Sequence, residues 1–238
     1  MKKILFILLV SFSISLNAQD KSYWTCFNFA VENQSDGEEL VNAVDLLFNS
    51  EEMSQMPFTV FMFEMEFVNS TTNYTHQICF LAPNADYFKG WGNDGPGEFA
   101  ESMLVNKIFE SVAKPVSNIL ASPLIFDPSK AGGYEYSNIW SFNVKDVAKF
   151  AALASEFIAV NSNNFDGVIE LHETISGAED GVTHIMVARS NNLGDWLRGR
   201  EAVLANPKSR NWFENSSKYG TLINSSAGKT LKVYPGSN

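Results

Sequence analysis

The feature of this chain that most constrains its fold is a long internal repeat. Thr75-His76-Gln77-Ile78 returns as Thr183-His184-Ile185-Met186, 108 positions later (183 − 75). Glu64-Met65-Glu66 returns in the same way as Glu170-Leu171-His172. Solenoid repeats have periods of about 20–50 residues. A period of this length therefore predicts two copies of one small domain.

Shorter matches support the same alignment of the two halves. Phe27-Asn28 matches Phe142-Asn143, and Trp91 matches Trp196. The spacing drifts by a few residues, as it does when only the loops change length.

Hydrophobic patterns predict the same order of elements in each half. Runs of aromatic and β-branched residues indicate strands, and apolar residues three or four apart indicate helices. In the first half we expect strands at 23–31, 58–68, 74–82 and 122–127 and helices at 36–53 and 98–113. In the second half we expect strands at 137–144, 167–175, 182–190 and 229–234, a helix at 146–160, and helical segments within 193–218.

Each half therefore has the order β-α-β-β-α-β, which is the ferredoxin-like motif, an antiparallel sheet with two helices on one face. In 58–68 the two faces of the strand are both apolar, with Phe61 and Phe63 on one side and Met62 on the other. Both faces of the sheet then need cover, and two modules can supply it by packing their sheets together.

We accordingly predict an α+β protein in which two tandem ferredoxin-like modules form a pseudo-dimeric α/β barrel. The expected divisions are a signal peptide at 1–19, module 1 at 20–128, a linker at 129–136 and module 2 at 137–238.

In element order and duplication the chain resembles the dimeric α/β-barrel superfamily in its fused form, over nearly the whole mature chain. The resemblance implies a barrel. Members of that superfamily include cofactor-independent monooxygenases, haem enzymes and small stress or ligand-binding proteins. No motif here selects one branch, so the resemblance assigns no catalytic residue and the cofactor stays unknown.

The N-terminus predicts export. Lys2 and Lys3 precede the apolar run Ile4–Val10, and Asn17-Ala18-Gln19 resembles a cleavage region. The run is too short to span a bilayer. We expect a periplasmic or extracellular protein without a membrane span.

The charge balance restricts the partners. The chain has 17 basic and 27 acidic residues, a net charge of −10. Such a surface repels phosphate backbones, which argues against nucleic acid as a partner. Export also permits a disulfide between Cys26 and Cys79, although buried free thiols fit the two strands equally well.

The three histidines are the first candidates for chemistry. A hairpin centred near Thr71 places Glu66 opposite His76, and one centred near Ala178 places His172 opposite His184. Directly opposed residues of antiparallel strands share a face. We therefore take as candidate catalytic residues His76, His172, His184 and Glu66, with Glu64 and Glu170 as ligand-binding neighbours on the same faces.

Imidazole and carboxylate suit proton transfer near neutral pH, and they also suit zinc. Neither hairpin has a compact ligand set of known spacing, so we predict no metal site. A polar cross-strand pair that only stabilises the sheet remains an alternative.

The repeated Trp91 and Trp196 and the repeated Asn28 and Asn143 are further candidates for ligand binding. The tryptophans can wall an apolar ligand or simply pack in the core. The asparagines can orient a ligand or satisfy neighbouring backbone groups.

From these features we expect an exported protein that binds a small apolar or aromatic molecule in a duplicated α/β barrel. One alternative is a cofactor-independent monooxygenase or isomerase that uses His/Glu pairs on the hairpins. Another is a structural or partner-binding protein without a pocket, whose edge strands pair with another chain.

Overall fold

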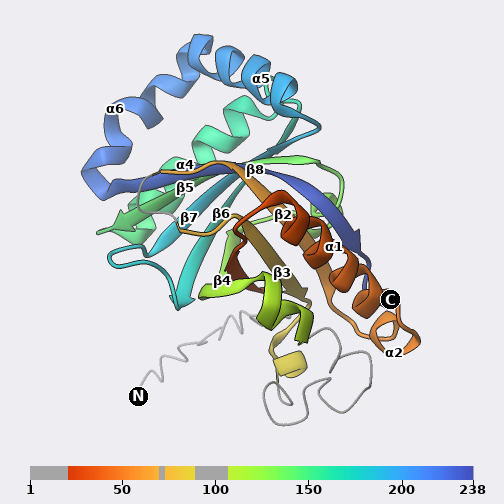
Figure 1. Cartoon of the computed structure of the whole chain (residues 1–238). Helices are drawn as coiled ribbons and strands as arrows, with labels where there is room; N and C mark the ends of the chain where they lie inside the picture. Colours follow the sequence, from red (N-terminus) through yellow and green to blue (C-terminus); the bar gives the residue numbers. More distant parts are fainter. Residues whose placement is uncertain (1–20, 70–72, 89–106, 238) are drawn as a thin grey trace, which may run out of the picture.

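The computed structural model describes residues 21–69, 73–88 and 107–237, which form a barrel with helices on its outside (Figure 1). The strands are β1 (Tyr23–Ala30), β2 (Thr59–Phe67), β3 (His76–Ala82), β4 (Lys114–Ile125), β5 (Tyr136–Val144), β6 (Gly167–Ser176), β7 (His184–Ser190) and β8 (Gly220–Tyr234). The helices are α1 (Gln34–Phe48), α2 (Glu51–Ser54), α4 (Val147–Asn161), α5 (Leu193–Ala205) and α6 (Arg210–Tyr219), and residues 107–112 are also helical. Within these ranges, no helix has the length and apolar character needed to cross a membrane.

The eight strands close into an antiparallel barrel in the order β1-β3-β2-β8-β5-β7-β6-β4. In the first half the order is β4-β1-β3-β2, and in the second half it is β8-β5-β7-β6, so the halves carry their strands in the same order. Two seams, β2 with β8 and β4 with β6, join the halves and leave no open edge. The predicted α+β barrel is confirmed.

Helices cover the outer face of the barrel in two groups. Figure 1 shows α4, α5 and α6 gathered over one side and α1 over another. The side chain of Asn33 caps α1 by accepting the N–H of Asp36, and that of Asp146 caps α4 by accepting the N–H of Lys149. The apolar faces of these helices pack on outward-facing strand residues such as Met62 and form two separate cores.

The inner face of β2 is also apolar, as the alternation along 58–68 predicts. Phe61 and Phe63 of β2 lie inside the barrel with Trp24, whereas Met62 faces the helices. Successive residues of a strand point to opposite faces, so each strand contributes to both layers. This double burial explains why the buried part of β2 lacks a polar face.

Two strands are much longer than the sequence pattern predicts. We expected a strand only at 122–127, but β4 begins at Lys114, and only at 229–234, but β8 begins at Gly220. The missed parts contain Pro115 and a run of small polar residues around Ser226. Several of those small residues face the barrel interior. Because that part of the interior is not densely apolar, its residues produce no hydrophobic pattern in the sequence.

The repeated Thr-His pair begins the third strand of each half and makes the same backbone contacts in both. The Thr75 hydroxyl accepts a hydrogen bond from the backbone N–H of Val31 (2.9 Å), and the backbone N–H of Thr75 donates to the carbonyl of Phe29 (2.8 Å). Thr183 makes the same two kinds of hydrogen bond in the second half, and its backbone N–H donates to the carbonyl of Phe142 (2.8 Å). This motif therefore ties the end of the first strand of each half to the third.

These contacts correct the alignment of the first strands. Phe29, rather than Phe27, corresponds to Phe142. Asn28 therefore corresponds to Ser141, and Asn143 lies two residues further along β5. The repeated Phe-Asn pair in the sequence is a coincidence of composition and not an equivalence of position.

Cys26 and Cys79 form a disulfide, which settles the redox state that the sequence leaves open. The two residues are directly paired in the β1–β3 ladder, and their S–S distance is 2.08 Å. Both line the interior of the barrel.

Candidate functional site

The strand registers differ from those predicted for both hairpins. His76 is opposite Glu64 and not Glu66, and His184 is opposite Glu173 and not His172. In the first hairpin the difference is two residues, so Glu66 and His76 stay on one face. In the second hairpin the difference is one residue, which moves a side chain to the other face of a strand. His172 therefore points into the barrel, whereas His184 points outward to the helices, as His76 does.

The two outward histidines are buried parts of the framework. His76 Nδ1 lies 3.0 Å from Thr75 Oγ1, and His184 Nδ1 lies 3.0 Å from Thr183 Oγ1. Burial lowers the pKa of both histidines and keeps the rings neutral. The structure does not bring either one together with His172.

Glu64 and Glu66 lie on the outer face near the β2–β8 seam. Both form ion pairs with Lys229, at 2.8 and 3.7 Å, and their side chains are partly exposed. Exposed pairs of this kind stabilise a fold weakly. Glu64 and Glu66 therefore share the outer face with His76, as predicted, although Glu64 and not Glu66 is directly opposite it.

A cavity of about 110 Å³ occupies the barrel interior. It approaches the roughly 150 Å³ of an apolar cavity that binds benzene, so it suits a molecule of about one ring. One end lies deep, between Trp24 and His172, which are 5% and 4% exposed. The other end opens to solvent, where Ser117 and Glu179 are exposed.

The deep end holds a buried charged cluster of Glu170, His172 and Arg189. Glu170 Oε2 lies 3.2 Å from His172 Nε2 and 3.4 Å from Arg189 Nε. Arg189 also donates from Nη1 to the carbonyl of Ala131 (3.0 Å), a residue of the linker between the halves. The linker therefore helps to close this end of the barrel.

The cluster keeps Glu170 ionised and sets which nitrogen of His172 donates. Burial opposes ionisation of Glu170, but the charge of Arg189 and the hydrogen bond from His172 outweigh it and hold the pKa of Glu170 below its ordinary value. A carboxylate only accepts hydrogen bonds, so His172 must donate from Nε2. When the ring is neutral, its lone pair is therefore on Nδ1.

Several polar atoms at this end have no hydrogen-bond partner within the described part of the chain. They include His172 Nδ1, Glu170 Oε1, Ser137 Oγ and Trp24 Nε1. Buried polar atoms are normally paired, and exceptions in a cavity indicate a site for water or ligand. An unpaired basic nitrogen next to a carboxylate is the arrangement that a general base requires.

Aromatic rings surround the cluster. His172 packs edge-on against Trp24, with ring centroids 6.3 Å apart, and lies 6.0 Å from Phe126. The guanidinium of Arg189 lies 5.3 Å from the Trp24 ring and 5.8 Å from that of Phe61. These rings exclude water and strengthen the electrostatic interactions among the three charged or polar groups.

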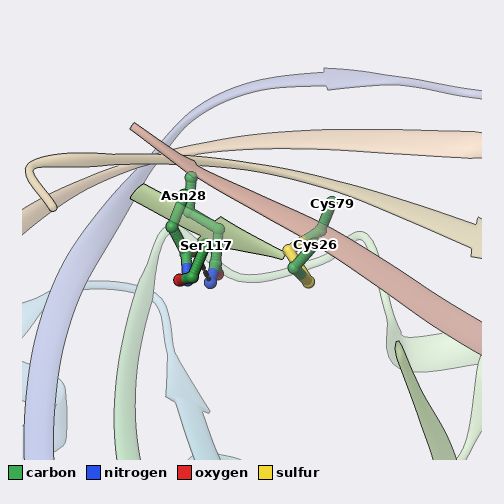
Figure 2. The surroundings of a disulfide bond; sticks show 5 residues. Cys26, Asn28, Cys79 and Ser117 are labelled. Carbon is green, nitrogen blue, oxygen red and sulfur yellow. Dashed lines mark hydrogen bonds between the residues drawn. A yellow bond between two sulfur atoms is a disulfide. The ribbon is translucent and has the colours of Figure 1, made fainter. Parts of the chain in front are cut away.

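Nearer the mouth, the cavity wall carries a neutral polar network beside the disulfide (Figure 2). Gln77 donates to Asn28 Oδ1 (2.7 Å), and Asn28 donates from Nδ2 to Ser117 Oγ (2.8 Å). Asn28 and Gln77 are directly paired across β1 and β3, next to the Cys26–Cys79 pair. Asn28 therefore lines the cavity, and its role as a ligand-binding residue stays a prediction.

The remaining predicted ligand-binding residues lie elsewhere. Trp196 lies in α5 and packs against the outer core, 6.3 Å from the Tyr136 ring, so it does not wall the barrel cavity. Asn143 does not line the cavity. Trp91 lies outside the described residues. Arg189, Gln77 and Trp24 also line the cavity but are not among the predicted residues. Only Arg189 has a signal in the sequence, a charge directly after the apolar run of β7.

Among the described residues, the site shows neither a metal centre nor room for a large cofactor. Within the described ranges, no group of three or more His, Cys, Asp or Glu side chains could hold a metal ion. A cavity of about 110 Å³ is also too small for a porphyrin, and His172 is already bonded to Glu170. The haem chemistry of some proteins with this type of barrel therefore does not fit this cavity.

No protein-family model matches this chain, and no curated protein matches it. Solved structures do match. A candidate monooxygenase from Lactobacillus acidophilus superposes with a TM-score of 0.60 at 9% identity, over 90% of this chain and 96% of its own. An anthrone oxidase-like protein gives 0.54 at 8% identity, over 91% and 94%. Chlorite dismutase from Candidatus Nitrospira defluvii gives 0.50 at 11%, over 90% and 92%.

At these identities the likeness establishes the fold, which is that of dimeric α/β-barrel proteins. The matched proteins are described as enzymes or as enzyme-like. The expectation of a binding protein as the main function is therefore wrong, and the comparisons favour the enzyme alternative.

Proposed function

We propose that this protein is an enzyme that removes a proton from a small, largely apolar substrate in the barrel cavity, with His172 as the general base. The observation that carries the proposal is the buried Glu170–His172 pair, whose free imidazole nitrogen belongs to a residue lining the cavity. A base held in one tautomer by a carboxylate is a recurring catalytic arrangement.

The chemistry follows from the charges of the cluster. His172 Nδ1 accepts a proton from an acidic C–H or O–H group of the substrate and becomes an imidazolium. Glu170 stabilises that positive charge, while Arg189 keeps Glu170 ionised and so acts as a positioning residue. Before the transfer the cluster is neutral, and afterwards its single positive charge balances the substrate anion.

The substrate anion has two possible fates, of which we favour oxygenation. In an isomerase, His172 returns the proton to another atom. In a cofactor-independent oxygenase, the anion reacts with dioxygen: a methylene carbon loses two hydrogens and gains one oxygen atom, and the second oxygen leaves as water. Dioxygen is the only oxidant in this step, and its two oxygen atoms end in the product and in water. The candidate monooxygenase and the anthrone oxidase-like protein with the same fold support this branch.

We further infer that the chain arose by duplication of one ferredoxin-like unit, with module 1 at 20–128 and module 2 at 137–238. The shared strand order and the matching contacts of Thr75 and Thr183 support this history. Export after cleavage of residues 1–19 is a companion proposal, supported by the Cys26–Cys79 disulfide, since disulfides persist in oxidising compartments.

The test measures proton abstraction directly. Wild-type protein is incubated in D2O with one-ring enolisable ketones such as phenylacetone, and deuterium incorporation is followed by NMR together with oxygen uptake. We expect exchange above the buffer rate, and a decrease of at least about 100-fold in His172→Gln, the usual size of a general-base contribution.

His184→Gln is the matched control, because it removes a buried histidine of the neighbouring strand that faces the helices. It should keep the exchange rate, provided that circular dichroism shows a folded protein. Equal rates in wild type and His172→Gln, or no exchange and no oxygen uptake by the wild type, would overturn the proposal.

A further inference from the structure

We infer that the Asn28–Gln77 amide pair is a specificity subsite for an uncharged, hydrogen-bonding group of the substrate, and that the barrel selects neutral molecules over anions. The inference deepens the proposed function and rests on it for placing the substrate in the cavity. The two amides line the wall between the open mouth and the charged cluster, so that a molecule reaching His172 passes them.

The fold does not need this amide pair. The corresponding residues of the second half are Ser141 and Ile185, which are directly paired across β5 and β7 and also line the cavity. Those strands pair as regularly as β1 and β3 do. Two amides in one half where the other half has a hydroxyl and an aliphatic side chain are therefore a feature of the site.

The pair is buried yet keeps spare hydrogen-bonding capacity. Asn28 is 2% exposed and Gln77 is 7% exposed. Each carboxamide has two N–H donors and an oxygen with two lone pairs. The bonds from Gln77 to Asn28 and from Asn28 to Ser117 use only part of that capacity. A ligand carbonyl, amide or hydroxyl group can use the remainder.

The charges along the cavity disfavour an anion. Arg189, the one cation among the described residues that line it, is already paired with Glu170. At the mouth stands the carboxylate of Glu179, which accepts a hydrogen bond from Asn224 (2.5 Å). The whole chain carries a net charge of −10. An anion would meet repulsion at the mouth and find no free counter-charge inside.

The reaction imposes the same requirement. A neutral substrate leaves the charge of the cluster and substrate together at zero before and after His172 takes the proton. A substrate with a second, negative group would carry an unpaired charge into a low-dielectric cavity, which is strongly unfavourable.

The test uses three one-ring probes of matched shape: benzamide, benzoate and ethylbenzene. Their binding to the full-length mature protein is measured by ligand-observed NMR or calorimetry, which needs no turnover. The key variant is Asn28→Ser/Gln77→Ile, which installs in the first half the same pair of residue types as Ser141 and Ile185 in the second half. Because the second half folds with that pair, the variant should fold as well.

We expect wild-type protein to bind benzamide at least about 10-fold more tightly than benzoate. The double variant should lose about 5- to 30-fold in benzamide affinity, the size of one or two hydrogen bonds. Its affinity for ethylbenzene should stay the same or rise. Glu179→Gln should raise benzoate affinity and leave benzamide affinity unchanged.

Equal affinities of the wild type for benzamide and benzoate, or an unchanged benzamide affinity in the double variant, would refute the subsite. These outcomes separate the two proposals. If His172→Gln loses exchange activity while the probes show no preference, the function stands and the subsite fails. If the probe preferences hold but the wild type exchanges no deuterium and takes up no oxygen, the subsite stands and the chemistry fails.

Discussion

Removal of the Cys26–Cys79 disulfide should cost the protein much of its stability while leaving the barrel intact. The bond joins residues that are already paired across β1 and β3, so its loss breaks no strand pairing in the folded state. Its main effect is on the unfolded chain, which gains the freedom of a long loop. The appropriate perturbations are reduction of the wild type and the double variant Cys26→Ala/Cys79→Ala.

The magnitude follows from the loop length. The cysteines are 53 residues apart in the sequence. For a loop of this length, the chain-entropy relation gives about 14 cal/mol/K, or about 4 kcal/mol at 25 °C. Typical measured values are about 2–4 kcal/mol, because the reduced unfolded state keeps some compactness. We therefore expect the free energy of unfolding to fall by about 2–4 kcal/mol.

Urea unfolding followed by tryptophan fluorescence measures this difference, with and without reductant. The double variant in the absence of reductant should match the reduced wild type, and reductant should not affect the double variant. The m-value should rise on reduction, since the unfolded chain expands and exposes more surface. A loss below about 1 kcal/mol, or a reduced protein without native circular dichroism, would refute the argument that the bond acts on the unfolded state.

Two further predictions concern the seam and the buried histidines. A Cβ at Gly228 would lie 2.3 Å from the Glu64 carbonyl oxygen across the β2–β8 seam. Gly228→Ala should therefore lower the free energy of unfolding by about 1–3 kcal/mol in urea unfolding. Gly132→Ala is the control and should leave it unchanged, because a Cβ at Gly132 has nothing within 4 Å. Burial lowers the pKa of His76 and His184, so the unfolded state binds protons more readily than the folded state. The free energy of unfolding should therefore keep its full value above pH 6.5 and fall as the pH decreases below 6.5. An unchanged free energy of unfolding down to about pH 5 would contradict this.

The fold could be predicted from the sequence where strands bury apolar side chains on both faces. The expected strand at 58–68 contains β2 (Thr59–Phe67), because Phe61 and Met62 both leave a hydrophobic signal. The first parts of β4 and β8 gave no such signal. Their inward side chains, such as Ser117 and Ser226, line a polar part of the cavity and carry the composition of a loop.

The site could be predicted only in part, because faces depend on register and register depends on the turn. The sequence places His172 and Glu170 on one hairpin, and the structure joins them inside the barrel. It also predicts His184 as their partner, and a one-residue difference in register sends that side chain to the helices. Arg189 lies on the same hairpin and on the same face as Glu170, but that relation can be read only with the correct register.

The two halves of the barrel share a framework but contribute different chemistry, and the residues that repeat are not the residues of the site. Thr75-His76 and Thr183-His184 repeat because both halves must anchor the third strand to the first. The interior positions that differ are those that line the cavity. The second half contributes the charged cluster around His172, and the first contributes the Trp24 wall, the disulfide and the Asn28–Gln77 pair. A symmetric pair of half-sites would need the same residues twice, whereas two halves of different sequence place the Glu170–His172 pair at one end of the cavity and the Asn28–Gln77 pair nearer the other.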